Sequence, residues 1–214
     1  MARVVIIGGH GKIALKLARL LAERGDEVSS VIRSESQTDD VAATGATPVV
    51  ADVEQLDTAG IGGVIAGNDV IVWSAGAGGG SPERTYAVDR DAAIRSIDAA
   101  AASGVGRYVM VSYFGAGPDH GVPEDNSFYP YAAAKAAADK YLKASSLQWT
   151  ILGPSRLTDE AGSGLISLGD DDVSKGEVSR DNVALVAAAV VADPATAHRV
   201  IEFNDGQTPV AQAL

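Results

Sequence analysis

Short apolar runs alternate with stretches of helical periodicity along almost the whole chain. The first run, Val4–Ile7, is uniformly apolar, as in a strand buried on both faces. The apolar residues that follow recur at the spacing of one helix face: Ile13, Leu17, Leu20 and Leu21. We therefore expect a strand followed by a helix that ends near Gly25.

The same alternation continues towards the C-terminus. Further apolar runs predict strands at Val28–Ile32, Thr47–Val50, Val70–Trp73, Tyr108–Val111, Gln148–Leu152 and Arg199–Phe203. The stretches between them favour helices, at about residues 36–43, 54–66, 83–103, 128–145 and 181–192. Strands that alternate with helices are joined by right-handed crossovers and form a parallel sheet with helices on both faces. We predict a doubly wound, three-layer α/β/α fold.

Residues 154–179 break this pattern, because they lack clear periodicity and are rich in glycine, serine and aspartate. We expect an irregular segment with no more than a short strand, lying over the edge of the sheet on the substrate side. A chain of 214 residues fits one large α/β domain better than two, so residues 1–214 are predicted to form a single domain.

Composition and charge narrow the classes of partner. The net charge of −11 repels nucleic acid phosphates and anionic lipid headgroups. No apolar stretch approaches the roughly 20 residues that cross a bilayer, and no signal peptide precedes the first strand. The chain has no cysteine and only three scattered histidines, so we expect no metal site. A cytoplasmic protein with a small-molecule partner, monomeric or homodimeric, is expected.

A glycine-rich turn joins the first predicted strand to the first helix. Gly8 permits a tight turn, Gly11 lets the backbone approach a pyrophosphate closely, and Ala14 keeps the helix near the strand. The N-terminus of the helix offers free N–H groups to phosphates. The strand–turn–helix context favours a dinucleotide over a turn without a ligand. The predicted cofactor contacts in this turn are Gly8, His10, Gly11, Lys12 and Ile13.

Arg33 follows the second predicted strand, 22 positions after Gly11. Sites for NAD usually place an acidic side chain near this position, whereas an arginine pairs with the 2′-phosphate of NADP. Ser34 adds a hydroxyl donor. Alternatively, Arg33 is a solvated side chain and Glu35 favours NAD. We predict NADP(H) as the preferred cofactor and NAD(H) as the alternative.

Two further strand ends extend the predicted cofactor path. Asp52 can accept a hydrogen bond from the adenine amino group, and Val53 can pack on the adenine ring. Ser74, Ala75 and Gly76 are small residues at the end of the fourth predicted strand, where a cofactor passes over the sheet. Because the carboxyl ends of parallel strands share one edge, we expect one continuous ligand path.

Three residues form a candidate catalytic group. Tyr131 and Lys135 lie four positions apart in a predicted helix, and Ser112 ends the fifth predicted strand. A lysine cation within about 4–6 Å lowers the pKa of a tyrosine, which can then exchange a proton with a substrate oxygen held by a serine hydroxyl. The spacing also arises by chance. The competing Tyr129 has only an alanine four positions later.

At these positions the sequence resembles the short-chain dehydrogenase/reductase superfamily. The similarity is to a small atypical NAD(P)-binding branch that is epimerase/dehydratase-like, with NmrA-like and biliverdin reductase B-like relatives. Residues 8–13 resemble the nucleotide loop of that branch, and Tyr131–Lys135 with Ala138 and Asp139 resemble its active-site helix. The resemblance covers the whole chain and implies a Rossmann-type fold, with Tyr131 and Lys135 also contacting the cofactor.

The resemblance extends to the strand and proline loop at residues 149–158, and it implies that Pro154 and Ser155 contact the nicotinamide end. Relatives commonly have an arginine before this proline, where the chain has Gly153, and Arg156 is a substitute. The predicted helix 83–103 contains no asparagine, which classical members use in a proton relay. This departure weakens the prediction of efficient turnover but not that of cofactor binding.

The favoured function is reduction of a small carbonyl or related organic substrate by NADPH. The resemblance leaves two alternatives open: a non-enzymatic NADP sensor and an NAD(P)-dependent epimerase/dehydratase. Only 79 residues follow Lys135, which is little chain for recognising a nucleotide sugar. Flavins or tetrapyrroles are further substrates implied by fold analogy. The predicted substrate pocket involves residues 76–84, 112–123 and 155–169, with an apolar lining of Tyr113, Phe114, Tyr129 and Leu157.

Overall fold

The computed structural model describes residues 1–79, 81–169 and 176–214. Its strands are β1 (Arg3–Ile7), β2 (Glu27–Ile32), β3 (Thr47–Val50), β4 (Val70–Trp73), β5 (Arg107–Val111), β6 (Gln148–Pro154), β7 (Arg156–Thr158), β8 (Leu165–Leu168), β9 (Glu177–Ser179), β10 (Arg199–Asp205) and β11 (Thr208–Pro209). All the strands predicted from the apolar runs are present, most with bounds within one residue or two of those expected.

The main helices are α1 (Lys12–Glu23), α2 (Thr38–Ala42), α3 (Thr58–Ile65), α4 (Pro82–Thr85), α5 (Ala93–Ser103), α6 (Tyr129–Lys143), α7 (Arg180–Ala192) and α8 (Val210–Ala213). Shorter helical turns are η1 (Glu35–Gln37), η2 (Tyr86–Ala92) and η4 (Pro194–Thr196). The predicted helix 54–66 begins only at Thr58, because the Asp57 carboxylate accepts a hydrogen bond from Gly60 N at 2.7 Å and so caps it.

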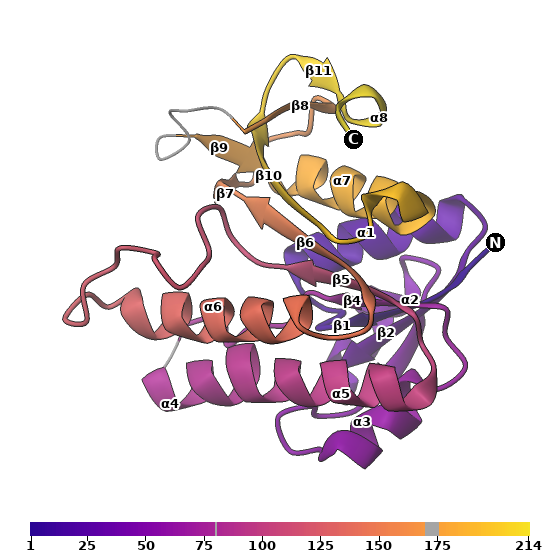
Figure 1. The fold of residues 1–214 in the computed structure, drawn as a ribbon. Helices are drawn as coiled ribbons and strands as arrows, with labels where there is room; N and C mark the ends of the chain where they lie inside the picture. The colour runs from indigo at the N-terminus through magenta and orange to yellow at the C-terminus, as the bar shows by residue number, and fades with distance from the viewer. Residues whose placement is uncertain (80, 170–175) are drawn as a thin grey trace.

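The main sheet has the strand order β11-β8-β10-β6-β5-β4-β1-β2-β3 (Figure 1). The strands from β3 through β1 to β6 and β10 pair in parallel. Helices cover both faces of this sheet. The predicted doubly wound, three-layer α/β/α architecture of Rossmann type is therefore confirmed.

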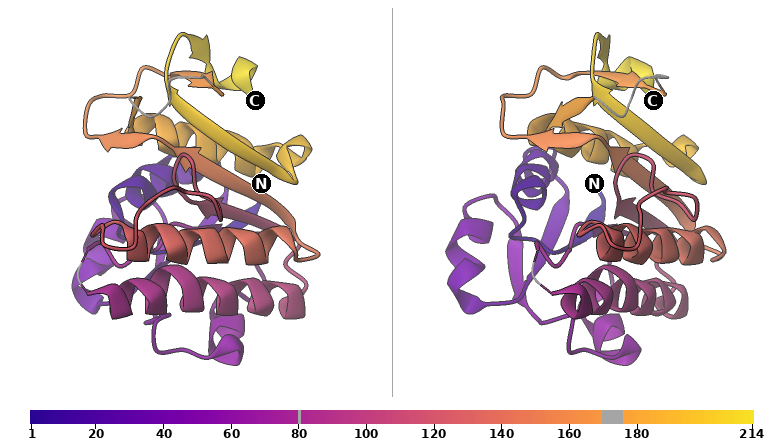
Figure 2. Two further views of the ribbon diagram at one scale, coloured as in Figure 1. Left: turned by 60° about the vertical axis from the view of Figure 1, so that its left-hand side comes forward. Right: turned by 90° about the vertical axis from the view of Figure 1, so that its left-hand side faces the viewer.

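Each face of the sheet has its own apolar core. Helices α1 and α7 pack on one face through buried residues such as Leu17 and Val186. On the other face, α3, α5 and α6 contribute Ile61, Ile97 and Leu142. Figure 2 shows α5 and α6 running side by side along this second face. Burial of both faces explains the uniformly apolar strands and makes the sheet a rigid support for the loops at its edge.

The expectation of an irregular segment at 154–179 was wrong in its extent. β6 continues to Pro154, β7 and β9 form a separate two-stranded sheet, and β8 extends the main sheet antiparallel to β10. Strands of three or four residues are too short to show a period of two, which is why the sequence did not reveal them. Residues 170–175 of this segment, and residue 80, lie outside the described part of the chain.

The predicted helix 83–103 is a continuous helical stretch that contains a π-helical segment. α4 leads into η2, which has π geometry over Tyr86–Ala92, and α5 follows directly. Such π segments are frequent at functional sites, and this one carries Asp89. Within the described residues, none of the helices combines the length and apolar character that crossing a bilayer requires.

Candidate cofactor groove and active site

The sheet reverses its winding between β1 and β4. β1 pairs with β2 on one side and with β4 on the other. The helical connections on these two sides cover opposite faces of the sheet, which leaves a crevice beyond the carboxyl ends of the strands. A groove of about 260 Å³ lies there, which we call the cofactor groove. Its lining brings together most of the predicted cofactor contacts: Gly8, His10, Gly11, Arg33, Asp52, Val53, Ser74, Ala75 and Gly76.

Two glycines of the phosphate loop are required by close packing. Gly8 has φ of 86°, and a Cβ there would lie 2.5 Å from Ala75 Cα. A Cβ on Gly9 would lie 2.6 Å from Ser30 Cβ. The loop therefore passes between β2 and the end of β4 with no room for a side chain at Gly8 or Gly9, as the predicted tight turn requires.

The N-terminus of α1 opens without a cap. Gly11 is the N-cap residue in extended conformation, with no side-chain hydrogen bond to the helix. Among the described residues, none accepts a hydrogen bond from the backbone N–H of Lys12, Ile13 or Ala14. Free N–H groups and the positive end of a helix dipole favour an anion at this position.

Among the contacts predicted in the phosphate loop and at the end of β2, three have side chains outside the lining of the groove. Lys12 Nζ lies 2.7 Å from Asp159 Oδ2 in an exposed ion pair. The Ile13 side chain packs into the core beneath the loop. The Ser34 hydroxyl accepts a hydrogen bond from Ser36 N and caps η1. Ile13 can therefore reach a phosphate only through its backbone N–H group, whereas Lys12 offers its backbone N–H group while its side chain is paired with Asp159.

One end of the groove has a basic and polar rim. Arg33 is exposed and lines the groove beside His10 and Gln37. The His10 ring lies 2.8 Å from Asp40 through Nε2 and 3.3 Å from Gln37 Nε2 through Nδ1. His10 is thus oriented from both sides at the phosphate loop. The sequence pattern did not indicate Gln37, because a glutamine in a short helical turn carries no distinctive signal.

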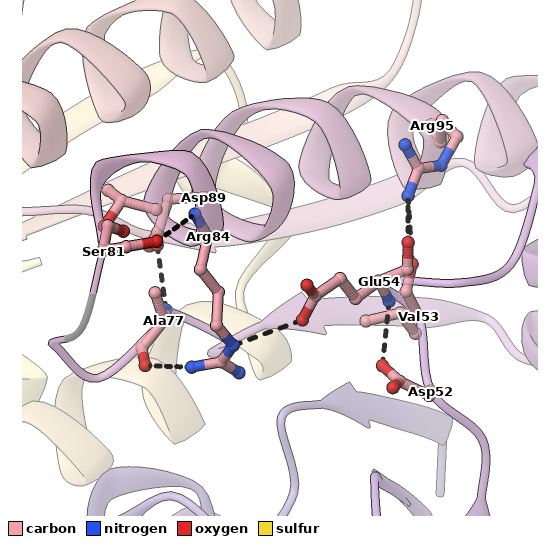
Figure 3. A network of polar contacts seen from close by, with 9 residues as sticks. Asp52, Val53, Glu54, Ala77, Ser81, Arg84, Asp89 and Arg95 are labelled. Carbon is pink, nitrogen blue, oxygen red and sulfur yellow. Dashed lines mark hydrogen bonds and ion pairs between the residues drawn. The ribbon is translucent and has the colours of Figure 1, made fainter.

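A network of polar contacts fixes the opposite wall of the groove (Figure 3). Arg84 donates hydrogen bonds to Glu54 Oε2 at 3.3 Å and to Ala77 O at 2.6 Å, and so links the loop after β3 to the loop after β4. Arg95 holds the loop after β3 by donating to the carbonyls of Val53 and Glu54. Arg84 and Glu54 line the groove but were not predicted as cofactor contacts, because charged residues in loops and helices are common.

Two pockets adjoin the groove on the other side of Ala77. The first, of about 330 Å³, shares Ala77 with the groove and extends to Phe128 and Tyr131. The second, of about 300 Å³, shares those two aromatic residues and extends to Pro154 and Ser155. Tyr131 therefore lines both of these pockets, and Ala77 lies at the boundary between the first of them and the cofactor groove.

Aromatic rings surround Tyr131. Its ring centroid lies 5.2 Å from that of Phe128 and 5.6 Å from that of Tyr113. Tyr113 and Phe114 line the second pocket, as the sequence indicated. Tyr129 lines neither pocket, because its ring packs against His120 at 5.6 Å. The expectation that Leu157 lines the pocket is also not met, since Leu157 packs against the core.

The predicted electrostatic effect of Lys135 on Tyr131 is wrong. Lys135 is 1% exposed, and its Nζ donates to Val111 O at 2.8 Å and to Met110 Sδ at 3.5 Å. Burial lowers the pKa of Lys135. Burial, reinforced by the carboxylates of Asp89 and Asp139, raises the pKa of Tyr131 instead of lowering it. Burial of the phenol is the main reason for the difference, and the two nearby carboxylates add to it.

Ser112 is buried at the end of β5 beside a carboxyl group that the sequence analysis did not assign a role. Its Oγ lies 2.5 Å from Asp139 Oδ2 in a hydrogen bond. Asp139 follows Lys135 by four positions, on the same helix face, which is the sequence signal that could have revealed it. Asp89 of η2 accepts a hydrogen bond from Ala77 N at 2.9 Å and fixes the loop that begins with Ser74.

Arg156, the expected substitute for the arginine that relatives carry before the proline, lines the second pocket. Its guanidinium is exposed and forms an ion pair with Glu177. This pair joins β7 to β9, the two strands of the small sheet. Arg156 therefore lies at the rim of the pocket that contains Pro154 and Ser155.

Comparisons with known proteins agree with this geometry. The model of a family described as NAD(P)H-binding matches residues 8–194. The chain is 36% identical over 214 residues to "Uncharacterized sugar epimerase YhfK" of Bacillus subtilis, covering 99% of this chain and 98% of that protein. Among solved structures, a candidate NAD-dependent epimerase/dehydratase of Bacillus halodurans is 30% identical, with a TM-score of 0.91 and coverage of 99% and 98%.

A second solved structure shows the same fold at lower identity. The anaerobilin reductase ChuY of Escherichia coli O157:H7 is 21% identical and superposes with a TM-score of 0.78, covering 95% of this chain and 97% of that one. The resemblance predicted from the sequence motifs, to an epimerase/dehydratase-like NAD(P)-binding branch, is confirmed by the family match and the two Bacillus relatives, whereas the likeness to ChuY shows the fold alone.

Proposed function

The chain belongs to the NAD(P)H-binding family, and on that premise we propose that it holds NADP(H) in the cofactor groove and reduces a small carbonyl or related organic substrate. The observation that carries the proposal is the uncapped N-terminus of α1 at the point where the sheet reverses its winding. From there the groove continues past Ala77 to the pockets around Tyr131.

The residues of the groove suit the successive parts of a dinucleotide. The free N–H groups of residues 12–14 suit a pyrophosphate. Asp52 and Val53 suit the adenine, since Asp52 uses only Oδ1 to accept from Glu54 N and Oδ2 is available. The small residues after β4 leave space towards Tyr131. When bound, the reduced nicotinamide supplies a hydride.

Tyr131 is suited to donating a proton rather than removing one. The phenol is protonated at neutral pH with its ordinary pKa and stays so when burial raises that pKa, so Tyr131 holds a proton for a substrate oxygen that gains charge. Lys135 supports the site indirectly, because its ammonium group donates to the carbonyl of Val111, the residue before Ser112. This arrangement favours the reducing direction of the reaction.

Arg33 is proposed to select NADP(H) through its 2′-phosphate. Replacing it (Arg33→Ala) is expected to weaken NADPH binding by about 10- to 100-fold, because one charge-assisted contact is lost. NADH affinity should stay within about twofold, since NADH has no 2′-phosphate. Fluorescence titration of both cofactors measures the two affinities.

Arg19→Ala is the matched control for Arg33. Arg19 is exposed on α1 and does not line the groove, so its removal changes the net charge by the same amount. NADPH affinity should be retained in this variant. An equal loss of NADH affinity in Arg33→Ala, or wild-type protein that binds NADH better than NADPH, would exclude the role proposed for Arg33.

The names of two relatives favour a second candidate, an epimerase. The Bacillus subtilis and Bacillus halodurans proteins have nearly the same length as this chain, so the short C-terminal region does not exclude this function. An epimerase regenerates its nicotinamide cofactor in each turnover, whereas a reductase consumes NADPH. Following NADPH absorbance against a panel of aldehydes, ketones, flavins and sugars separates the two, because only the reductase gives a net decrease.

A further inference from the structure

Three ionisable side chains lie buried together near Tyr131. Asp89, Lys135 and Asp139 are 1%, 1% and 2% exposed. With all three ionised, the cluster would carry one uncompensated negative charge. Among the described residues no ion pair joins Lys135 to either carboxylate, so neither charge is cancelled at close range. A buried charge without a direct partner is costly, and such a group tends to take up a proton.

The contacts of the two carboxyl groups show which one is easier to neutralise. Burial raises the pKa of Asp89 as well, but Lys135, the Ala77 N–H that Oδ2 accepts, and Arg84 oppose this rise. Asp139 has one close contact, with Ser112, and its buried Oδ1 has no partner among the described residues. An ionised carboxylate needs donors at both oxygens, so Asp139 is the poorer site for a negative charge.

The surroundings of Asp139 point the same way. Burial raises the pKa of Asp139, and the effect is opposed by Lys135, Ser112 and then Lys143. On the elements packed against α6, Asp89 adds negative charge and the hydroxyl of Tyr108 is already bonded to Ser96. Asp98 of α5 bonds to Tyr141 on the exposed side. The carboxyl group of Asp139 also contributes to the raised pKa of Tyr113 and of Tyr131, but within the described residues neither hydroxyl donates a hydrogen bond to Asp139.

We propose that Asp139 is a neutral carboxylic acid in the folded protein and donates its proton to Ser112 Oγ, which turns the Ser112 hydrogen towards the substrate. Hydrogen positions follow from the network, and a contact of 2.5 Å fits either direction of donation. If Asp139 were ionised, Ser112 would use its only hydrogen on Oδ2 and could only accept from a substrate. A neutral Asp139 leaves that hydrogen free for an oxygen that only accepts, such as a carbonyl.

Asp139 is therefore a positioning residue, and its state determines that the site takes a carbonyl rather than a hydroxyl at Ser112. This inference rests on the proposed function, because it assumes that the substrate oxygen binds at Ser112. The protonation state itself does not depend on turnover. It can be measured in the protein without cofactor or substrate.

The test is the pH dependence of thermal unfolding of wild-type protein and Asp139→Asn. An acid that is neutral in the folded chain and ionised in the unfolded chain releases a proton on unfolding, so wild-type stability falls as pH rises between the two pKa values. The asparagine variant lacks this pH-dependent loss of stability, and the side-chain amide of the asparagine can donate an N–H to Ser112. Its Tm relative to wild type should therefore rise by roughly 3 °C per pH unit as the pH increases above the ordinary pKa of an aspartate, until Asp139 ionises in the folded chain.

The opposite sign overturns the proposal. If Asp139 is ionised and accepts from Ser112, the variant loses a charge-assisted bond, and its Tm should fall further below wild type as pH rises. Asp119→Asn, at an exposed aspartate, is the control and should show a flat difference. With a reducible substrate, kcat of wild type should decrease at high pH, and this decrease should be absent in the asparagine variant.

A second measurement needs no substitution at Asp139. The side-chain carboxyl ¹³C resonance of Asp139 is assigned in uniformly labelled wild-type protein through its bonded carbons and is recorded at about pH 7. The shift of a neutral acid supports the proposal, and the shift of an ionised carboxylate overturns it. If the wild-type protein does not bind a dinucleotide, the proposed function is refuted, but the measured protonation state of Asp139 still holds.

Discussion

The substitution Gly11→Asp is expected to abolish dinucleotide binding while leaving the free energy of unfolding within about 1 kcal/mol of wild type. Gly11 has the extended conformation of an N-cap, which aspartate adopts readily. Its carboxylate would accept from the free N–H groups of α1, which stabilises the helix but occupies the proposed donors to the pyrophosphate. Charge repulsion adds to the loss, so affinity should fall by about 100-fold or more.

Gly11→Asn separates charge from occupation of the N–H groups. Asparagine caps a helix as well as aspartate does but adds no charge, so it should weaken binding less. Calorimetric titration with NADPH and thermal unfolding give the two quantities. Wild-type affinity in Gly11→Asp would show that the phosphates bind elsewhere. Loss of folding would show that the Cβ, which lies 3.3 Å from Gly8 O, is not tolerated.

Tyr131→Phe is expected to lower kcat by about 10²- to 10⁴-fold while NADPH affinity stays within about twofold of wild type. The phenol hydroxyl is the proposed proton donor, whereas the phosphate contacts lie at the other end of the groove. The ring itself, which packs on Tyr113 and Phe128, is preserved by phenylalanine. Steady-state kinetics with a substrate whose reduction oxidises NADPH measures kcat, and cofactor titration measures the NADPH affinity.

Tyr129→Phe is the matched control, since it removes the same hydroxyl two positions away on a side chain that lines neither pocket. It should retain turnover. Unchanged turnover in Tyr131→Phe would remove Tyr131 from the mechanism. If the wild-type protein binds NADPH but reduces no compound of the panel, and both variants keep its NADPH affinity, the protein would instead fit a sensor of NADP.

The long elements could be predicted from the sequence because their patterns extend over many residues. The alternation of apolar strands with amphipathic helices such as α1 determined the layer architecture. The short strands β7, β8, β9 and β11 left no such pattern, because their existence depends on pairing partners far along the chain. The same limit explains why the antiparallel edge of the sheet was not predicted.

The cofactor groove was more predictable than the chemistry beside it. Strand ends at one edge of a parallel sheet converge by topology, so Gly8, Arg33, Asp52 and Ser74 could be grouped from their positions alone. The charge balance around Tyr131 depends on burial and on Asp89, which approaches from η2. The spacing within one helix predicted that Lys135 and Tyr131 share a face. It did not predict which neighbouring charges determine the pKa of Tyr131.

The central claim, that the N-terminus of α1 binds the paired phosphates of a nicotinamide dinucleotide, is tested most directly by calorimetric titration of the wild-type protein with NADPH and NADH. The account predicts saturable heat with one dinucleotide per chain, with NADPH the tighter ligand. Absence of binding heat with both cofactors over a range of temperatures would contradict it.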